Sequence, residues 1–346
     1  VCKMSFQHTM NRRSALKLLG ALGLGTAAPE FVFNVQAFAA QSSLHTVSKT
    51  LPLMKTLVSM TVCDRSRTLA EEALGQAFEH VQALIPVFNR FDAGSHLSRL
   101  NRSGILHEVP AELFQVLETS KYLFYQSRRS FDVTILPLLE AHQQSVLRTG
   151  RPPEHPALQS ILQTVGFEKL ELHPGTVRFT RPGMRITLDG IAKGYLVDRA
   201  AEALRRQGVH SALINAGGDI RAIGDKGGAP WRIGLQDPLD RKRTAATFKL
   251  TDTAVATSGN YQNAYDPLAR HHHIVSKGLG DSPQGILSVT VLAPSAMLAD
   301  GLSTMLFLNS PEENLRQVAS LPECEALIMT RGGRTHHSSG LQRFLG

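Results

Sequence analysis

One segment constrains the fold of this chain more than any other, because glycine turns within it open a helix and close a hairpin. It runs over Leu188–Gly224 and reads LDGIAKGYLVDRAAEALRRQGVHSALINAGGDIRAIG. A helix is predicted over Ile191–Arg206, ended by Gly208, and a buried strand is expected at His210–Ile214. The tight turn at residues 215–219 joins that strand to a second one. A helix followed by a hairpin is therefore expected here.

Helices and strands are mixed irregularly along the rest of the chain. Strands are predicted at residues 57–63, 169–172, 176–179, 185–188, 231–236, 248–250, 254–258 and 287–292. Helices are predicted at residues 69–85, 112–127 and 295–308, with Pro86 as a stop and residues 143–156 as an exposed connector. This order favours an α+β fold over a doubly wound parallel sheet. We expect one compact domain, in one or two lobes, with a largely antiparallel sheet and flanking helices.

The first 39 residues are typical of an export signal rather than of a folded element. Arg12 and Arg13 precede a mildly apolar, glycine-rich run, and Ala37–Ala39 offers a small-x-small cleavage site. This pattern predicts a twin-arginine signal at residues 1–39, recognised by the twin-arginine export machinery. Residues 40–346 are then the mature domain, and its expected location is the periplasm.

The composition bounds what the mature part can do. With 42% hydrophobic and 19% charged residues, the chain has the balance of a globular protein. No later run reaches the ~18 apolar residues that span a bilayer, so a soluble protein without a transmembrane segment is expected. Loss of residues 1–39 removes four basic residues and one acidic residue, so the formal charge falls from +8 to +5. Arg241–Arg243 is the only basic cluster, and nucleic acid is not an expected partner.

Two cysteines remain in the mature part, Cys63 and Cys324. An oxidising compartment would permit one bridge between them, and two buried free thiols are the alternative. The sequence leaves both open.

Four sequence blocks resemble the signature of the ApbE family, flavin transferases that use FAD to attach FMN to a Thr or Ser of another protein. They are the Leu188–Gly224 segment, SRRSFDVTILPLLE from Ser127, AVATSGNYQ from Ala254 and PSAMLADGLSTMLF from Pro294. The resemblance covers about residues 50–330. It implies the family's fold, FAD as substrate, Mg²⁺ as the metal and an acceptor protein as partner. Many members are lipid-anchored through a cysteine after the signal, and none stands near Ala39, which argues for a soluble protein.

Asp300 and Thr304 are the expected side-chain ligands of the metal. Four positions apart in a predicted helix, they lie on one face, one turn apart. Their oxygens suit Mg²⁺, a hard cation that commonly bridges to phosphate. The resemblance implies the same pair, joined by the backbone carbonyl of Ala192. The spacing alone equally allows a Thr bonded to its own helix and an Asp in solvent.

Asp189 and Lys193 flank the glycine turn that opens the predicted helix. Gly190 and Gly194 permit close backbone approach, and N–H groups at the helix start suit a pyrophosphate. Asp189 could also cap that helix, and Lys193 could lie in solvent. The resemblance implies that both contact FAD or its metal. Asp189 is also a candidate catalytic residue, together with His273.

Five further positions match those that surround the flavin and adenine in the family: Met54, Phe91, Ser130, Phe131 and Asp132. Lys55 stands where the family has glycine. Phe91 stands where tyrosine is common, which keeps ring stacking and loses a hydroxyl hydrogen bond. Met54 and Phe131 could instead be core residues.

Small hydroxyl residues at Thr257 and Ser258 precede a glycine and could bond a flavin phosphate or merely end a strand. The resemblance favours the phosphate contact. Asp219 lies in the turn at residues 215–219, and a structural hairpin is a sufficient explanation for it.

The triplet His271–His273 begins the segment that departs most from the family. The family usually has His-Ile-Ile-Asp-Pro followed by Thr-Gly, and here Ser276 and Lys277 replace the Asp-Pro. His273 keeps the expected histidine and is the candidate base for the acceptor hydroxyl, because imidazole titrates near neutral pH. Ile274 follows it as a predicted FAD contact. A zinc site made of adjacent histidines is not expected, because no second Cys or His pair stands at ligand spacing.

The sequence thus predicts Mg²⁺-dependent transfer of FMN from FAD to a Thr or Ser hydroxyl, with release of AMP. Two alternatives stay open. Water could replace the hydroxyl, which would make the chain a FAD pyrophosphatase that yields FMN and AMP. The second alternative is a non-catalytic periplasmic flavin-binding or assembly protein. The retained Asp300 and Thr304 argue against it.

Overall fold

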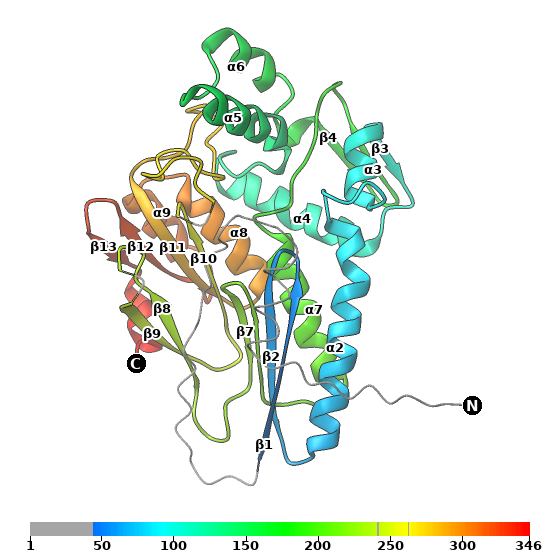
Figure 1. Cartoon of the computed structure of the whole chain (residues 1–346), viewed down its shortest axis with the longest axis vertical. Coiled ribbons are helices and arrows are strands. Elements are labelled where there is room, and N and C mark those ends of the chain that lie inside the picture. The colour runs from blue at the N-terminus through cyan, green and yellow to red at the C-terminus, as the bar shows by residue number, and fades with distance from the viewer. Residues whose placement is uncertain (1–43, 241, 262) are drawn as a thin grey trace. The chain divides into compact units, whose positions relative to one another are not determined.

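An eight-stranded antiparallel sheet organises the fold (Figure 1). The computed structural model describes residues 44–240, 242–261 and 263–346, so the predicted signal at residues 1–39 lies outside the described residues. In spatial order the strands are β1 (His45–Leu53), β2 (Thr56–Asp64), β6 (Ala212–Ala216), β7 (Asp219–Ile223), β10 (Ala254–Gly259), β11 (Ile286–Ala293), β12 (Glu325–Thr330) and β13 (Thr335–His337). Each neighbouring pair is antiparallel.

Three helices pack on one face of this sheet, namely α2 (Arg67–Phe88), α7 (Ala192–Arg206) and α8 (Ala296–Phe307). Side chains alternate between the two faces of a strand. On β6, Ala212, Ile214 and Ala216 belong to the same apolar cluster as the three helices, whereas Leu213 belongs to another. Helix α4 (Ala111–Gln126) contacts α2 and α8 behind this layer.

A two-stranded ribbon covers the opposite face near Leu213. Its strands β8 (Trp231–Gln236) and β9 (Thr244–Leu250) are antiparallel. Trp231 is buried in the second apolar cluster together with Leu213, and its Nε1 donates to Ile223 O at 3.4 Å. The centre of the large sheet is therefore covered on both sides, which explains why all eight residues of β11 are buried.

A smaller sheet and shorter helices complete the described part of the chain. The small sheet has the order β3 (Ile105–His107), β5 (Thr176–Phe179), β4 (Leu170–His173). The helices are α3 (His96–Ser103), α5 (Leu136–Thr149), α6 (His155–Leu162) and α9 (Pro311–Ala319), with 3-10 turns η1 (Val133–Ile135), η2 (Phe167–Lys169) and η3 (Ser339–Phe344). Among the described residues, none of these helices has the length and apolarity to cross a membrane.

The predicted α+β fold with a largely antiparallel sheet is confirmed, and the described residues fall into one unit. Pro86 does not end its helix, which continues to Phe88. A proline removes one backbone donor and disturbs the turn before it, and the buried side chains of Val87 and Phe88 hold the last turn in place.

Two other local predictions fail, one in part and one entirely. Residues 143–156 are a connector only at 150–154, because α5 continues to Thr149, with Val146 buried, and α6 begins at His155. Residues 185–188 form no strand. The side chain of Asn101 replaces a sheet partner there, since its Oδ1 accepts from Ile186 N–H at 2.7 Å and its Nδ2 donates to Ile186 O at 2.9 Å.

Cys63 and Cys324 are both buried free thiols. They belong to different apolar clusters, Cys63 with the ribbon and Cys324 with the helices. Of the two alternatives for these cysteines, the structure therefore has the unbridged one.

Candidate active site

Asp300 and Thr304 lie on α8 where it crosses the start of α7. The Asp300 carboxylate is buried, and its Oδ2 accepts a hydrogen bond from Gly194 N–H at 2.9 Å. A Cβ on Gly194 would overlap the carbonyl oxygen of Ala296, so the two helices cross where one of them has no side chain. A Cβ on Gly190 would lie 2.9 Å from Thr304 Oγ1. The two glycines bring the turn before α7 directly against Asp300 and Thr304.

Lys193 lies beside two buried carboxylates. Its Nζ is 3.2 Å from Asp219 Oδ2, although that oxygen has no well-aligned hydrogen bond within the described part of the chain. Burial alone would lower the pKa of Lys193, but Asp219 and Asp300 raise it. Burial raises the pKa of Asp219, and burial together with the Asp219 charge raises that of Asp300 well above its ordinary value. The two carboxylates repel one another, and a bound cation would relieve that repulsion.

Asp198 of α7 holds the N-terminus of α8. Its Oδ1 accepts from Ala296 N–H and its Oδ2 from Met297 N–H, both at 2.8 Å. The hydroxyl of Ser295 caps the same end. Because the first N–H groups of a helix have no partner within it, these bonds fix the position of α8. The helix with the two predicted metal ligands is thereby attached to the helix that begins at Ala192.

The end of β10 places Ser258 against the same face of α8. Ser258 Oγ lies 2.7 Å from Ser303 Oγ and 3.3 Å from Thr304 Oγ1. The hydroxyl of Thr257 lies 2.9 Å from that of Thr290 on the neighbouring strand. Ser258 therefore joins the cluster around Thr304, whereas this contact of Thr257 is within the sheet.

Asp189 is half exposed and forms an ion pair with Arg90, whose Nε lies 2.8 Å from Asp189 Oδ2. The Arg90 guanidinium also lies over the ring of Phe91, 4.1 Å from its centroid, and Lys55 Nζ lies 3.4 Å from the same centroid. Phe91 is 58% exposed. The structure therefore presents an exposed aromatic ring with two cations beside it.

Asp189 is not the cap of α7, so that alternative is wrong. The helix begins at Ala192 with Ile191 as its N-cap residue and without a side-chain cap. Two N–H groups that could have met a pyrophosphate are bonded within the protein, Ala192 to Leu188 O at 2.9 Å and Gly194 to Asp300. The first turn of α7 is thus mainly a support for Asp300.

His273 lies near these charges. Its backbone N–H donates to Asn263 O at 3.1 Å, and its buried Nδ1 has no partner among the described residues. Burial lowers the pKa of His273 to about 4, and the negative charge of Asp189 offsets part of that shift. The expectation that His273 titrates near neutral pH is therefore wrong, because burial disfavours its charged form. The imidazole is neutral near pH 7 and can accept a proton.

Asp132 begins η1 and keeps one oxygen free. Its Oδ1 accepts from Thr134 N–H at 3.0 Å and from the Thr134 hydroxyl at 2.6 Å. Its Oδ2 has no hydrogen-bond partner in the described segments and faces Lys277 Nζ at 3.8 Å. Burial raises the pKa of Asp132, and the bonds from Thr134 and the charge of Lys277 act against that shift. One of the residues that departs from the family pattern therefore supplies a cation to Asp132.

The remaining predicted contacts have mainly structural surroundings. Ser130 Oγ donates to Ser127 O at 3.0 Å, and Phe131 is buried in the main core. Ile274 is also buried in that core. Met54 packs against it at the turn between β1 and β2, where its φ of 52° lies in the left-handed region. For these four residues, contact with FAD stays a prediction.

The residues present fit a Mg²⁺ ion. The Asp300 carboxylate, the Thr304 hydroxyl and the Ala192 carbonyl are all oxygen donors, the class that this ion takes. The glycine cradle at Gly190 keeps a side chain away from Thr304, and a dication would relieve the repulsion from Asp219 that helps to raise the pKa of Asp300.

Comparison with known proteins decides the family. The model of the ApbE family matches residues 54–328. The chain belongs to the ApbE family. The FAD:protein FMN transferase of Vibrio cholerae is 29% identical over 290 residues, which cover 81% of this chain and 85% of that protein.

Two crystal structures of ApbE proteins share the fold. The ApbE protein from Thermotoga maritima is 28% identical with a TM-score of 0.76, and the match covers 87% of this chain and 99% of that one. The apo form of the flavinyl transferase ApbE from Pseudomonas stutzeri is 25% identical with a TM-score of 0.77, over 88% of this chain and 98% of that one.

The structure adds residues to this ApbE-family site that sequence reasoning missed. Arg90 pairs with Asp189 across 99 sequence positions. Tyr265 lies near both, and its burial raises the pKa of its hydroxyl to about 12. Asp198 caps a helix other than its own. No local pattern could reveal these partners, because each contact joins distant segments of the chain.

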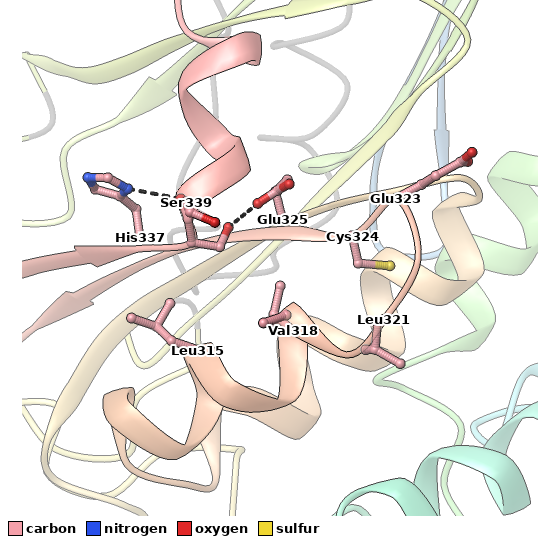
Figure 2. A pocket seen from close by; sticks show the side chains of 10 residues that line it. Leu315, Val318, Leu321, Glu323, Cys324, Glu325, His337 and Ser339 are labelled. Carbon is pink, nitrogen blue, oxygen red and sulfur yellow. Dashed lines mark hydrogen bonds between the residues drawn. The ribbon is translucent and has the colours of Figure 1, made fainter.

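A cavity of about 320 Å³ lies elsewhere in this ApbE-family chain, between α9 and the end of the sheet (Figure 2). Leu315, Val318 and Leu321 line one side, and Cys324 and Glu325 line another. Burial raises the pKa of the Cys324 thiol to about 11, so it is not a reactive thiolate. None of the predicted site residues lines this cavity.

Proposed function

We propose that this chain is a FAD:protein FMN transferase, which moves FMN from FAD to a Thr or Ser hydroxyl of another protein and releases AMP. The observation that carries the proposal is the oxygen cluster of Asp300 and Thr304, held against a glycine turn with Lys193 beside it. It stands in a chain of the ApbE family whose relatives are named for this activity.

Asp300, Thr304 and the Ala192 carbonyl would hold a Mg²⁺ ion. When bound, the ion would neutralise charge on the FAD pyrophosphate and on the departing AMP phosphate. The side chains themselves provide position. Asp198 and Gly194 fix α8 against α7, so the carboxylate and the hydroxyl need no rearrangement before the reaction.

Lys193 and the exposed ring of Phe91 are proposed FAD contacts. Lys193 keeps its positive charge because Asp219 and Asp300 raise its pKa, and it can pair with a phosphate oxygen. The ring of Phe91 offers a face on which a flat heterocycle can stack, and Arg90 and Lys55 beside it favour an anionic ligand.

His273 is the proposed base. Its neutral imidazole would take the proton of the acceptor hydroxyl as the hydroxyl oxygen attacks the FMN phosphorus. The bond from that phosphorus to the bridging oxygen breaks, and AMP carries that oxygen away. The unpartnered Nδ1 leaves one ring nitrogen available for a proton.

Export is a separate proposal. Arg12 and Arg13 direct residues 40–346 to the periplasm through the twin-arginine machinery, and residues 1–39 are removed. Its test is the location of a variant with Arg12→Lys and Arg13→Lys, which should remain in the cytoplasm. Mature protein in the periplasm of that strain would contradict the proposal.

The activity test combines purified protein, FAD, Mg²⁺ and an acceptor domain. Transfer gives a covalent FMN adduct on a Thr or Ser, detected by mass spectrometry, and one AMP per adduct, detected by chromatography. FMN and AMP without an adduct, at a rate indifferent to acceptor, would identify a pyrophosphatase. FAD bound but unchanged with Mg²⁺ present would leave a flavin-binding protein.

A further inference from the structure

Two histidines and one aspartate meet where α5 contacts the segment of residues 263–285. His142 Nε2 is 2.7 Å from Asp281 Oδ1, and His271 Nδ1 is 2.9 Å from the same oxygen. One ligand atom of each residue lies within 4.8 Å of the other two. We call these three residues the His–Asp–His cluster. The proposed FMN transfer uses none of them.

The cluster is buried on one side and reachable on the other. His142 is fully buried in α5, whereas the side chains of His271 and Asp281 are 14% and 27% exposed. A small ion therefore has a path from solvent to the buried nitrogen without unfolding of α5. A path of entry is one requirement of a metal site.

The cluster also has the chemical groups of a metal site. It offers two imidazole rings and one carboxylate. Metals bind neutral imidazole and ionised carboxylate.

We propose that the His–Asp–His cluster is a second metal site, which binds a divalent transition metal ion of the zinc type. Two imidazole nitrogens and one carboxylate oxygen, with water as a fourth ligand, form a ligand set that zinc takes. Mg²⁺ prefers oxygen ligands and is not the expected ion. At bond lengths of about 2.0 to 2.1 Å, ligand atoms in a tetrahedral site lie about 3.3 Å apart. Small side-chain shifts bring the three atoms to that spacing.

The rival account is a hydrogen-bonded link without metal. In that account each histidine donates to Asp281 Oδ1, which also accepts from Ser282 N–H at 2.7 Å. The sequence argued against zinc at the His271–His273 triplet, because the second histidine of the cluster comes from α5 and is far away in sequence. The adjacent His272 is not part of it, since its ring bonds Pro283 O and the Ile274 N–H.

A metal here would fasten the segment that carries the proposed base. His271 stands two positions before His273, and Val275 just beyond packs in an apolar cluster with α5 and α6. The metal would hold one end of this stretch as the apolar cluster holds the other. Only this consequence rests on the proposed function, and metal binding itself can be tested without it.

The test uses the tag-free purified chain, stripped with a chelator and exchanged into metal-free buffer. Zinc is added, and the unbound excess is removed by gel filtration. The zinc that stays with the protein is then measured by plasma mass spectrometry. Cobalt is added in parallel, because its visible absorption reports tetrahedral coordination. We expect one zinc per chain and the cobalt bands of a tetrahedral site.

Variants locate the ion. Asp281→Asn and His142→Gln keep size and hydrogen-bonding capacity and should weaken zinc binding by more than about 100-fold, since loss of an outer-shell partner alone costs about 10- to 100-fold. His155→Ala, at the exposed start of α6, is the matched histidine control and should bind zinc unchanged. Asp300→Ala should still retain one zinc, which separates this site from the proposed Mg²⁺ site.

No zinc retained by the unaltered chain, or equal affinity in both cluster variants, would overturn the proposal. Where a variant does not fold, the cobalt spectrum of the unaltered chain still tests the proposal, because absence of the tetrahedral bands would overturn it. Asp300→Ala could lose FMN transfer and still bind zinc, and Asp281→Asn could lose zinc and still transfer FMN. Either result shows that the two proposals can fail separately.

Discussion

The two halves of the candidate site are built in different ways. The helical half, where α7 meets α8, is held by backbone packing at Gly194 and by the cap from Asp198. The loop half, residues 263–285, is held largely by side-chain hydrogen bonds around Asp281 and Ser282. Backbone packing resists any added atom, whereas a hydrogen-bonded loop depends on individual polar groups. The predicted metal ligands lie in the half with less freedom, and the predicted base in the half with more.

The largest effect should follow from Asp300→Ala in the helical half. Loss of the one charged ligand should reduce Mg²⁺-dependent turnover of FAD about 10³-fold, which corresponds to about 4 kcal/mol. The fold should survive, because the change also removes one of two buried carboxylates beside Lys193. Initial rates over a series of Mg²⁺ concentrations measure it, with Thr304→Val as the milder comparison. A variant whose rate still rises with Mg²⁺ as before would contradict the ligand assignment.

In the loop half, His273→Ala should slow adduct formation about 10²-fold or more while FAD affinity changes less than about tenfold. The pH profile supplies an independent reading. Since the pKa of His273 is lowered to about 4, its imidazole is neutral above that value. Single-turnover rates should therefore stay level near neutral pH and fall as pH decreases through about 4. A variant with weakened FAD binding and an unchanged transfer rate would show that His273 is not the base.

A smaller effect is expected at the helix crossing. Gly194→Ala should destabilise the fold by about 1 to 3 kcal/mol, because its new methyl group overlaps the Ala296 carbonyl. Gly75→Ala is the matched control, since Gly75 lies inside α2 with open space around it and should stabilise by about 0.5 to 1 kcal/mol. Denaturant unfolding of both variants gives the two free energies. If both variants changed the free energy of unfolding in the same direction, α7 and α8 would not be in close contact at Gly194.

The smallest global effect should come from Ser282→Ala in the loop half. Ser282 Oγ accepts from His272 N–H and donates to His272 O, both at 2.9 Å, so its loss leaves two buried backbone groups unpaired. Local opening should become easier by about 1 to 3 kcal/mol. Hydrogen exchange should speed up in residues 263–285, with little change in α7 or α8. Faster exchange throughout the sheet instead would show that this loop is not a separate unit of stability.

Sequence reasoning predicted well those parts of the fold that have a local cause. The glycine turn, α7 and the hairpin of β6 and β7 come from short-range signals, and these elements end within a few residues of their predicted bounds. The strand expected at residues 185–188 failed because Asn101, far away in sequence, supplies the partner for Ile186. The edge strands β1 and β13 were not predicted, since short or alternating polar segments resemble loops. The strand β12 was also missed, because a short apolar run such as EALIMT has no periodicity that separates a strand from a helix.

The same division applies to the site. Asp300 and Thr304 share a helix face, which spacing reveals, and the structure brings the glycine turn to them. Arg90, Asp198 and His142 could not be predicted, because their roles depend on which distant segment each one meets. Asp219 was explained as a hairpin residue, and its side chain turned out to pair with Lys193.

The two hydrogen bonds between Asn101 and Ile186 have a consequence for how the sequence of this protein can change in evolution. A strand inherits its direction from the sheet that it joins, so every change in sheet twist would redirect the chain that leaves it. Residues 185–188 are aligned instead by the Asn101 amide and by the hydrogen bond from Thr187 N–H to Val133 O, so the chain reaches Asp189 outside any ladder. Mutations that reshape the sheet can therefore accumulate without moving the turn at Gly190, and the sheet and this turn can evolve at different rates.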